Sequence, residues 1–248
     1  MTTFKVNAIE PEGATTNLAV GESGQNITIG ADSIKTNTLK DAGGNVLFTS
    51  NGSGVLSSVS GFGGAQTLIS SVTASATANI SFTTGITSMY KEYVFEYINI
   101  HPATADADFH FQVNASGQSG FNESITSTAF RAFIGESDNA AALSYVVSDD
   151  QATSDLGYQR LIEGGGMPAG QNDASCSGTL HLYNPASTTY VKNFIARGHS
   201  MKYSGGYYYS IDAFFGGYFN VAAAITQIDF KFSSGNIDAG IIKMYGIK

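Results

Sequence analysis

Several kinds of residue are scarce in this chain of 248 residues, and each scarcity excludes a class of protein. There is one cysteine, Cys176, so no disulfide can form within the chain. Lysine and arginine total 12 against 20 aspartates and glutamates, which gives a net charge of −8. Because no basic run or face can neutralise phosphates, we expect no nucleic-acid partner.

Long apolar runs are absent as well. No stretch approaches the roughly 20 apolar residues that a membrane-spanning helix needs, so we expect no membrane insertion. The first residues, MTTFKVNAIEPEG, contain no apolar run flanked by basic residues and do not resemble a secretory signal. We therefore expect the chain to be made and folded in a cytoplasm.

What the sequence does contain is typical of a β protein. Tryptophan is absent, but 16 phenylalanines and 13 tyrosines accompany 29 glycines, and aromatic residues favour strands. Residues with alternating polarity, separated by turn-forming residues, predict strands at 77–84, 90–100, 107–115, 127–135, 143–147, 177–184, 190–198, 207–219, 225–234 and 240–247. No stretch has the start and stop signals of a helix. Residues 65–248 are therefore predicted to form an antiparallel β-sandwich, jelly-roll-like.

The first 64 residues differ in composition from the rest. They end in the glycine- and serine-rich stretch SSVSGFGG (57–64), and their only aromatic residues before that stretch are Phe4 and Phe48. A short strand is predicted at 46–50, but one copy of this region holds too little apolar surface to offset the entropy of ordering, about 1–2 kcal/mol per residue. Two alternatives follow: a disordered linker, or association of several copies.

Association predicts a particular arrangement. Three copies of Ile34, Leu39 and Phe48 would form small closed apolar layers on a shared axis, with the Ser, Thr and Asn side chains in water. Region 1–64 is therefore predicted to be a trimeric stalk region of short strands, with these three residues at the trimer contacts.

We find no motif that predicts catalysis, a cofactor or a metal site. The nucleophile elbow, the phosphate-binding loop and the zinc-protease motif are all missing. Asp106, Asp108 and His110 alternate on one strand face and could hold a divalent cation, although a solvated strand end is the favoured interpretation. We therefore expect no enzymatic activity, no catalytic residue and no cofactor.

The densest aromatic stretch is KYSGGYYYSIDAFFGGYF, residues 202–219. Tyrosine is common on binding surfaces because its ring is a rigid apolar body with a polar tip on which sugars can stack. Tyr203, Tyr207, Tyr208 and Tyr209 are therefore candidates for a glycan or receptor surface. The alternative is that these rings pack on the two sides of a central strand.

Three stretches carry a family resemblance: ITIGADSIKTNTLKDAGGNVLFTSNGSGVLSSV (27–59), YKEYVFEYINIHPATADADFHFQ (90–112) and FKFSSGNIDAGIIKMYGIK (230–248). With them the chain resembles virion structural proteins of tailed bacteriophages of marine bacteria. The resemblance implies a homotrimeric fibre or spike, attached to other virion proteins by its N-terminal region and displaying its C-terminal domain. It implies assembly in the host bacterial cytoplasm and a final location on the virion, but no catalytic residues.

The predicted function is a non-enzymatic appendage that adheres to polysaccharide or protein of the host surface. Alternatives are a capsid decoration or head-fibre protein that mainly stabilises the shell, and a glycan-depolymerising tailspike. A tailspike is expected to have a long solenoid or a groove lined by carboxylates, and the sequence marks out neither. A secreted carbohydrate-binding module is disfavoured because no signal is visible.

Overall fold

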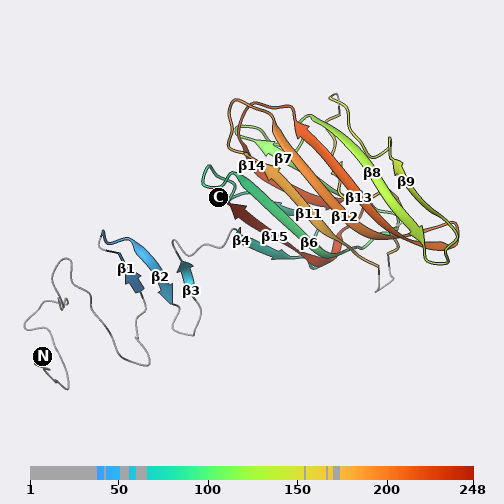
Figure 1. Cartoon of the computed structure of the whole chain (residues 1–248), viewed down its shortest axis with the longest axis horizontal. Coiled ribbons are helices and arrows are strands. Elements are labelled where there is room, and N and C mark those ends of the chain that lie inside the picture. Colours follow the sequence, from blue (N-terminus) through green and yellow to red (C-terminus); the bar gives the residue numbers. More distant parts are fainter. Residues whose placement is uncertain are drawn as a thin grey trace, which may run out of the picture. The chain divides into compact units, whose positions relative to one another are not determined.

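The structure is a computed structural model that describes residues 38–41, 43–50, 56–59, 66–153, 155–165, 167–169 and 174–248. Within these residues all regular structure is strand, and the all-β prediction is confirmed. The chain divides into two compact units, Met1–Phe62 and Gly63–Lys248, while the composition places the boundary at residue 64. Figure 1 draws both units.

The unit Met1–Phe62 contains a three-stranded antiparallel sheet in the order β1-β2-β3. Its strands are β1 (Thr38–Lys40), β2 (Val46–Ser50) and β3 (Leu56–Val59), and β2 confirms the strand predicted at 46–50. A turn closed by the Asp41 carboxylate, which accepts a hydrogen bond of 2.8 Å from the Asn45 amide, joins β1 to β2. Ile34 lies outside the described residues.

The unit Gly63–Lys248 holds two antiparallel sheets of unequal size, so the predicted sandwich is confirmed. The order of the large sheet is β4-β15-β6-β11-β12-β13-β8-β9, and that of the small sheet is β10-β7-β14-β5. The large sheet consists of β4 (Gln66–Thr73), β15 (Ile237–Ile247), β6 (Glu92–Pro102), β11 (Cys176–Tyr183), β12 (Lys192–Ser204), β13 (Tyr207–Phe219), β8 (Ile125–Gly135) and β9 (Ala141–Tyr145). The small sheet consists of β10 (Gln159–Arg160), β7 (Phe109–Ala115), β14 (Ile225–Phe232) and β5 (Ile80–Phe82).

Every strand predicted after residue 64 overlaps a strand of the structure, but two strands were not predicted. Strand β4 reads QTLISSVT, whose serines and threonines hide the alternation, and it is held by pairing with β15. Strand β10 has two residues, too few to show a period, and it pairs with β7. Pairing with a neighbouring strand, not local pattern, defines both of them.

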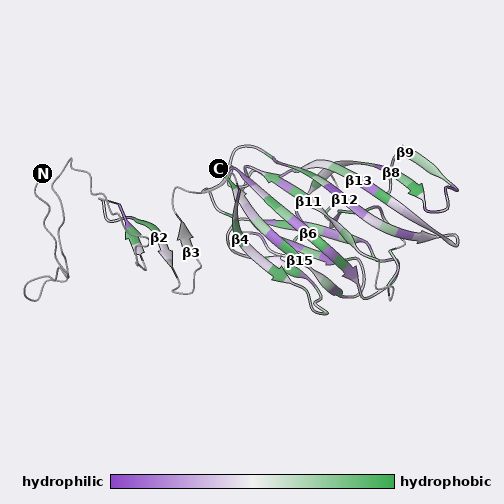
Figure 2. Cartoon of the chain, turned by 60° about the horizontal axis from the view of Figure 1, so that its bottom comes forward, coloured by the Kyte–Doolittle hydropathy of each residue, from purple (hydrophilic) through white to green (hydrophobic). Residues whose placement is uncertain are grey.

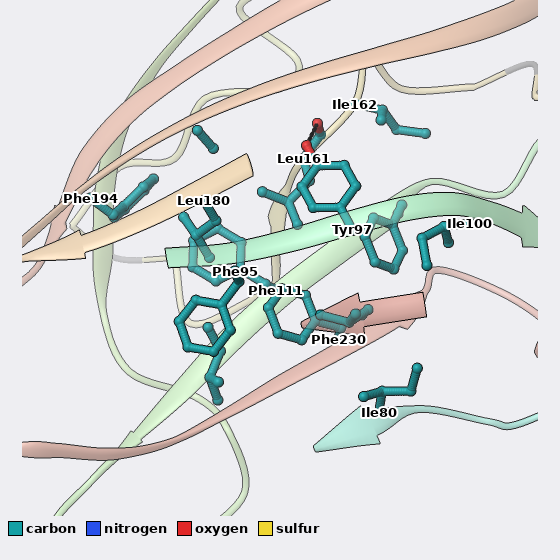
Figure 3. Close-up of a cluster of buried hydrophobic side chains, with 14 of the residues drawn as sticks. Ile80, Phe95, Tyr97, Ile100, Phe111, Leu161, Ile162, Leu180, Phe194 and Phe230 are labelled. Carbon is teal, nitrogen blue, oxygen red and sulfur yellow. Dashed lines mark hydrogen bonds between the residues drawn. The ribbon is translucent and has the colours of Figure 1, made fainter. Parts of the chain in front are cut away.

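Alternation of side chains builds the core between the two sheets. Figure 2 shows hydrophobic and hydrophilic residues alternating along the strands of the large sheet. Rings from both layers meet in the interior, where the centroids of Phe95 and Phe230 lie 5.6 Å apart and those of Phe111 and Phe194 lie 5.2 Å apart. Figure 3 shows this cluster, which fixes how the two layers stack.

Strand β6 departs from strict alternation at one position. Alternation along 90–100 predicts Asn99 on the same face as Tyr93, Phe95 and Tyr97, but Asn99 is exposed and Ile100 is buried instead. Asn99 has a φ of 51°, in the left-handed region, and the pairing with β11 shifts register here. A bulge of this kind turns the following side chains to the other face, so the prediction for Asn99 is wrong.

Among the described residues, the strands of the small sheet are shorter than the longest strands of the large sheet. Strands β12 and β13 have 13 residues each, whereas β14, in the small sheet, has 8. Near the end of β12 the Lys202 ammonium donates a hydrogen bond of 3.0 Å to the carbonyl oxygen of Gly164, in the segment after β10.

Among the described residues no helix has the length and apolar character to cross a membrane.

Candidate ligand-binding surface

The four candidate tyrosines lie on the hairpin of β12 and β13, on more than one face. Tyr203 and Tyr208 are cross-strand partners whose ring centroids lie 4.8 Å apart on the outer face of the large sheet. Tyr207 is exposed beside the turn. Tyr209 has its ring 6.0 Å from that of Phe133, on the inner face. Part of the stretch 202–219 therefore offers an exposed surface for a ligand, and part of it packs on the inner side of the sheet.

A larger aromatic row crosses the outer face beside this hairpin. Phe214 of β13 pairs with Phe130 of β8, which pairs in turn with Tyr145 of β9. The rings of Phe130 and Phe214 are stacked, with centroids 4.8 Å apart and planes inclined by 5°. Phe130 is 44% exposed. Figure 1 shows β8 and β13 side by side, and the stacked rings form an apolar aromatic platform on the outer face of the large sheet.

A charged pair borders the platform on β12 and β13. The Arg197 guanidinium lies 5.0 Å from the centroid of the Phe214 ring and donates hydrogen bonds of 3.0 and 3.2 Å to the two oxygens of Asp212. These hydrogen bonds raise the pKa of Arg197 above its usual value. The platform therefore has a polar rim that can bind hydroxyl groups.

A hollow of about 400 Å³ adjoins the platform. Its floor is Gly216, which pairs with Thr128 on one side and with Ile195 on the other. A Cβ at Gly216 would meet no atom closer than the Thr128 hydroxyl at 3.9 Å, so the missing side chain leaves open space. Phe130, Phe214 and His181 contribute to the walls. We call Phe130, Phe214, Arg197 and the hollow over Gly216 the outer platform.

Ionic contacts at the edge of the small sheet tie together segments that are far apart in sequence. The Arg160 guanidinium binds Asp108 at 2.8 Å and Asp149 at 2.6 Å. His110 lies beside them, and its buried Nε2 has no hydrogen-bond partner among the residues that the structure describes. Burial lowers the pKa of His110 to about 4, because removal from water disfavours the charged ring.

The structure does not bring Asp106, Asp108 and His110 together as cation ligands. Asp106 is exposed with a φ of 61°, and Asp108 is engaged by Arg160. In the described part of the chain no three His, Cys, Asp or Glu side chains converge in a way that could hold a metal ion.

Sequence analysis did not identify most residues of the outer platform. Phe214 falls within the aromatic stretch 202–219, but its partner Phe130 lies about eighty residues earlier in β8. Only the register of two strands brings these rings together. The alternation in β8 and β13 does place each ring on a definite face of its strand. The sequence pattern therefore indicates the face of each ring but not which strands pair.

Of the trimer-contact candidates, Leu39 and Phe48 are described. They are cross-strand partners in β1 and β2; Leu39 is 43% exposed and Phe48 is half-buried.

Comparisons with family models, with curated proteins and with solved structures found no match.

Proposed function

We propose that this chain is a non-enzymatic structural protein of a bacteriophage virion, a homotrimeric fibre or spike whose C-terminal sandwich adheres to polysaccharide on the host surface. The observation that supports adhesion best is the outer platform, where stacked aromatic rings lie exposed beside an open hollow. The resemblance of the sequence to phage virion proteins supports a structural role in a bacteriophage virion.

The chemistry of the outer platform suits a sugar chain. Sugar rings have one face of C–H groups, which packs on aromatic rings, and an edge of hydroxyls, which needs polar partners. Phe130 and Phe214 provide the first, and Arg197, Asp212 and His181 provide the second. The hollow of about 400 Å³ falls within the usual range of small-molecule sites, about 300–1,000 Å³.

The sheet of β1, β2 and β3 supports association of several copies. Leu39 and Val46 are 43% and 37% exposed. A sheet with an apolar face has to bury that face against another element to be stable. Association through Leu39 and Phe48 would bury these side chains, and attachment of the N-terminal region to another virion protein is the further role we propose for this unit.

Binding to polysaccharides tests adhesion. The full chain is passed over immobilised dextran, laminarin, alginate and extracted bacterial capsule, and retention is measured by surface plasmon resonance. Gly216→Leu should fill the hollow and abolish binding with an unchanged melting temperature. Leu68→Ser, which removes an exposed leucine from β4 at the opposite edge of the same sheet, is the matched control. Equal binding by wild type and Gly216→Leu would refute the outer platform as the site.

A second experiment tests placement on the particle. Gold-labelled antibody against the sandwich is applied to intact phage particles and imaged. We expect label at the ends of projecting fibres. Label spread evenly over the capsid would support a decoration protein instead, and unlabelled particles would refute the virion assignment.

A third experiment tests the absence of enzymatic activity. Each polysaccharide that binds is incubated with the chain, and new reducing ends are measured. We expect none. Their release would refute the non-enzymatic proposal and support a depolymerising tailspike.

A further inference from the structure

We propose that a second cavity, on the inner face of the large sheet, binds a carboxylated sugar of the uronate or sialate type. The cavity has a volume of about 220 Å³. Its walls include Arg131, Phe133, Glu163, Lys202, Tyr209 and Ile211. It lies at the end of β12 and β13 and on the other face of the sheet from the outer platform, so it is a separate site.

The walls of the cavity carry more positive than negative charge. Glu163 accepts an ionic contact from Arg131 and another, of 2.9 Å, from the Lys202 ammonium, both at its Oε1. Two cations thus share one carboxylate. The neighbouring group of Arg160, Asp108 and Asp149 carries one net negative charge, but none of the three lines the cavity. In a chain with a net charge of −8, the cavity is a local site for an anion.

The environment of Lys202 agrees with an excess of positive charge on the cavity walls. Burial and the nearby Arg131 both lower the pKa of Lys202 below its usual value. A bound carboxylate would offset the repulsion between the two cations and would make charge-assisted hydrogen bonds with them.

One buried polar atom of the cavity residues has no hydrogen-bond partner in the described part of the chain. Arg131 donates from Nε to the Ser144 hydroxyl and contacts Glu163 through Nη1. The Glu163 side chain is only 6% exposed, yet its Oε2 has no hydrogen-bond partner. A buried acceptor without a donor is costly. A ligand that fits both side chains has a carboxylate for Arg131 and a hydroxyl for Glu163.

The remaining walls favour a sugar over a small inorganic anion. The rings of Phe133 and Tyr209 meet at 74° with centroids 6.0 Å apart, and Ile211 adds an apolar side chain. Apolar walls match the C–H face of a sugar ring and offer nothing to phosphate. The cavity is below the usual size of drug-binding pockets, which fits about one monosaccharide. The choice of a sugar rests on the proposed adhesion to polysaccharide, whereas the choice of a carboxylate rests on the cavity alone.

Isothermal titration calorimetry on the full chain tests the inference, with tri-galacturonate and N-acetylneuraminate as probes. Maltotriose, acetate and inorganic phosphate are the comparison ligands. We expect binding of at least one of the two carboxylated sugars, and binding of maltotriose, acetate and phosphate at least tenfold weaker. Binding of phosphate or maltotriose as tight as that of the carboxylated sugars would overturn the inference.

Two variants locate the binding. Arg131→Gln should weaken it at least tenfold. Because Arg131 also holds Glu163, Ala140→Glu provides a second variant: Ala140 is an exposed residue at the cavity, where a new carboxylate repels the ligand without disturbing the core. Ala103→Glu makes the same change of charge on an exposed turn after β6 and should leave binding unchanged. Equal loss with Ala103→Glu, or no loss with Ala140→Glu, would overturn the site.

The two proposals fail in different ways. Gly216→Leu should abolish adhesion through the outer platform and leave titration with tri-galacturonate or N-acetylneuraminate unchanged. Intact polysaccharide binding without any response to the two probes overturns the inner cavity alone. Probe binding that Ala140→Glu removes, in a chain that adheres to no polysaccharide, overturns the outer platform alone.

Discussion

The hydroxyl of Tyr97 lies 3.2 Å from the carbonyl oxygen of Leu161 and 3.2 Å from that of Arg197. It joins the segment after β10 to the middle of the large sheet. Gly198 sits against this contact, since a Cβ there would lie 2.0 Å from the Leu161 oxygen and 2.6 Å from the Tyr97 hydroxyl.

Gly198→Ala should therefore be among the most destabilising single-methyl changes in the chain. The backbone oxygen of Leu161 cannot move away cheaply, so we expect a loss of about 3 kcal/mol or more in the free energy of unfolding. Urea unfolding followed by tyrosine fluorescence measures it. Gly216→Ala adds the same methyl group over open space and should cost less than about 1 kcal/mol. Equal losses for the two variants would contradict the packing around Tyr97.

Phe111→Ala should lower stability by about 3–5 kcal/mol. Its ring is fully buried and faces Phe194 at 5.2 Å and Phe219 at 6.0 Å, so truncation leaves a cavity between the sheets. Phe130→Ala removes a ring of the same size from the exposed outer face and should cost about 1 kcal/mol or less. Thermal denaturation of both variants checks the difference.

Lowering the pH from about 6.5 to about 4 should destabilise the sandwich through His110. In the unfolded chain histidine takes up a proton near pH 6.5, while the buried ring stays neutral down to about 4. The unfolded state binds more protons in this window, so stability is present above it and is lost as the pH falls, by up to about 3 kcal/mol. Urea unfolding at pH 7, 5.5 and 4.5 should show a shallower loss for His110→Gln. Identical slopes for the wild type and His110→Gln would refute the role of His110.

Two arginines with carboxylate partners should differ strongly in their contribution to the free energy of unfolding. Arg160→Met leaves the largely buried Asp108 and Asp149 without their cation and should cost about 3–5 kcal/mol. Arg197→Met breaks a pair whose arginine is 63% exposed and should change the free energy of unfolding little, because solvent screens the pair. Chemical denaturation of the two variants provides the comparison, and a larger loss for Arg197→Met would contradict it.

Phe48→Ser should weaken the trimer that we propose. Phe48 is half-buried in β2 beside Leu39, and three copies on one axis would lose three rings. Sedimentation equilibrium should show a trimer for the wild type and a concentration-dependent shift to monomer for the variant. A wild-type chain that sediments as a monomer would refute the trimeric stalk.

Local pattern predicted the sandwich well because most of its strands alternate strictly and end in turn residues. The alternation in β6 placed Tyr93, Phe95 and Tyr97 on one face, and it failed at Asn99, where a bulge reverses the faces. The strand β4 could not be predicted because its partner β15 lies about 170 residues away.

The two candidate sites were harder to predict than the fold, because their residues come from segments that are distant in sequence. Phe130 and Phe214, or Arg131, Glu163 and Lys202, meet only because strands and a loop from distant parts of the chain are packed together. The tyrosine-rich stretch did mark the β12–β13 hairpin, since Tyr209 reaches the inner cavity. It could not mark the partners that the other strands supply.

The same hairpin has a consequence for the order of folding. Strands β12 and β13 pair along all 13 residues without a register shift, and Gly205 and Gly206, with φ of 60° and 88°, connect them in a tight turn that favours pairing. Contacts between residues close in sequence form with the smallest loss of chain entropy. We expect this hairpin to form in the transition state for folding, with β11 and β8 adding on its two sides. Strand β4 has to wait for β15, at the end of the chain, before it can join the sheet.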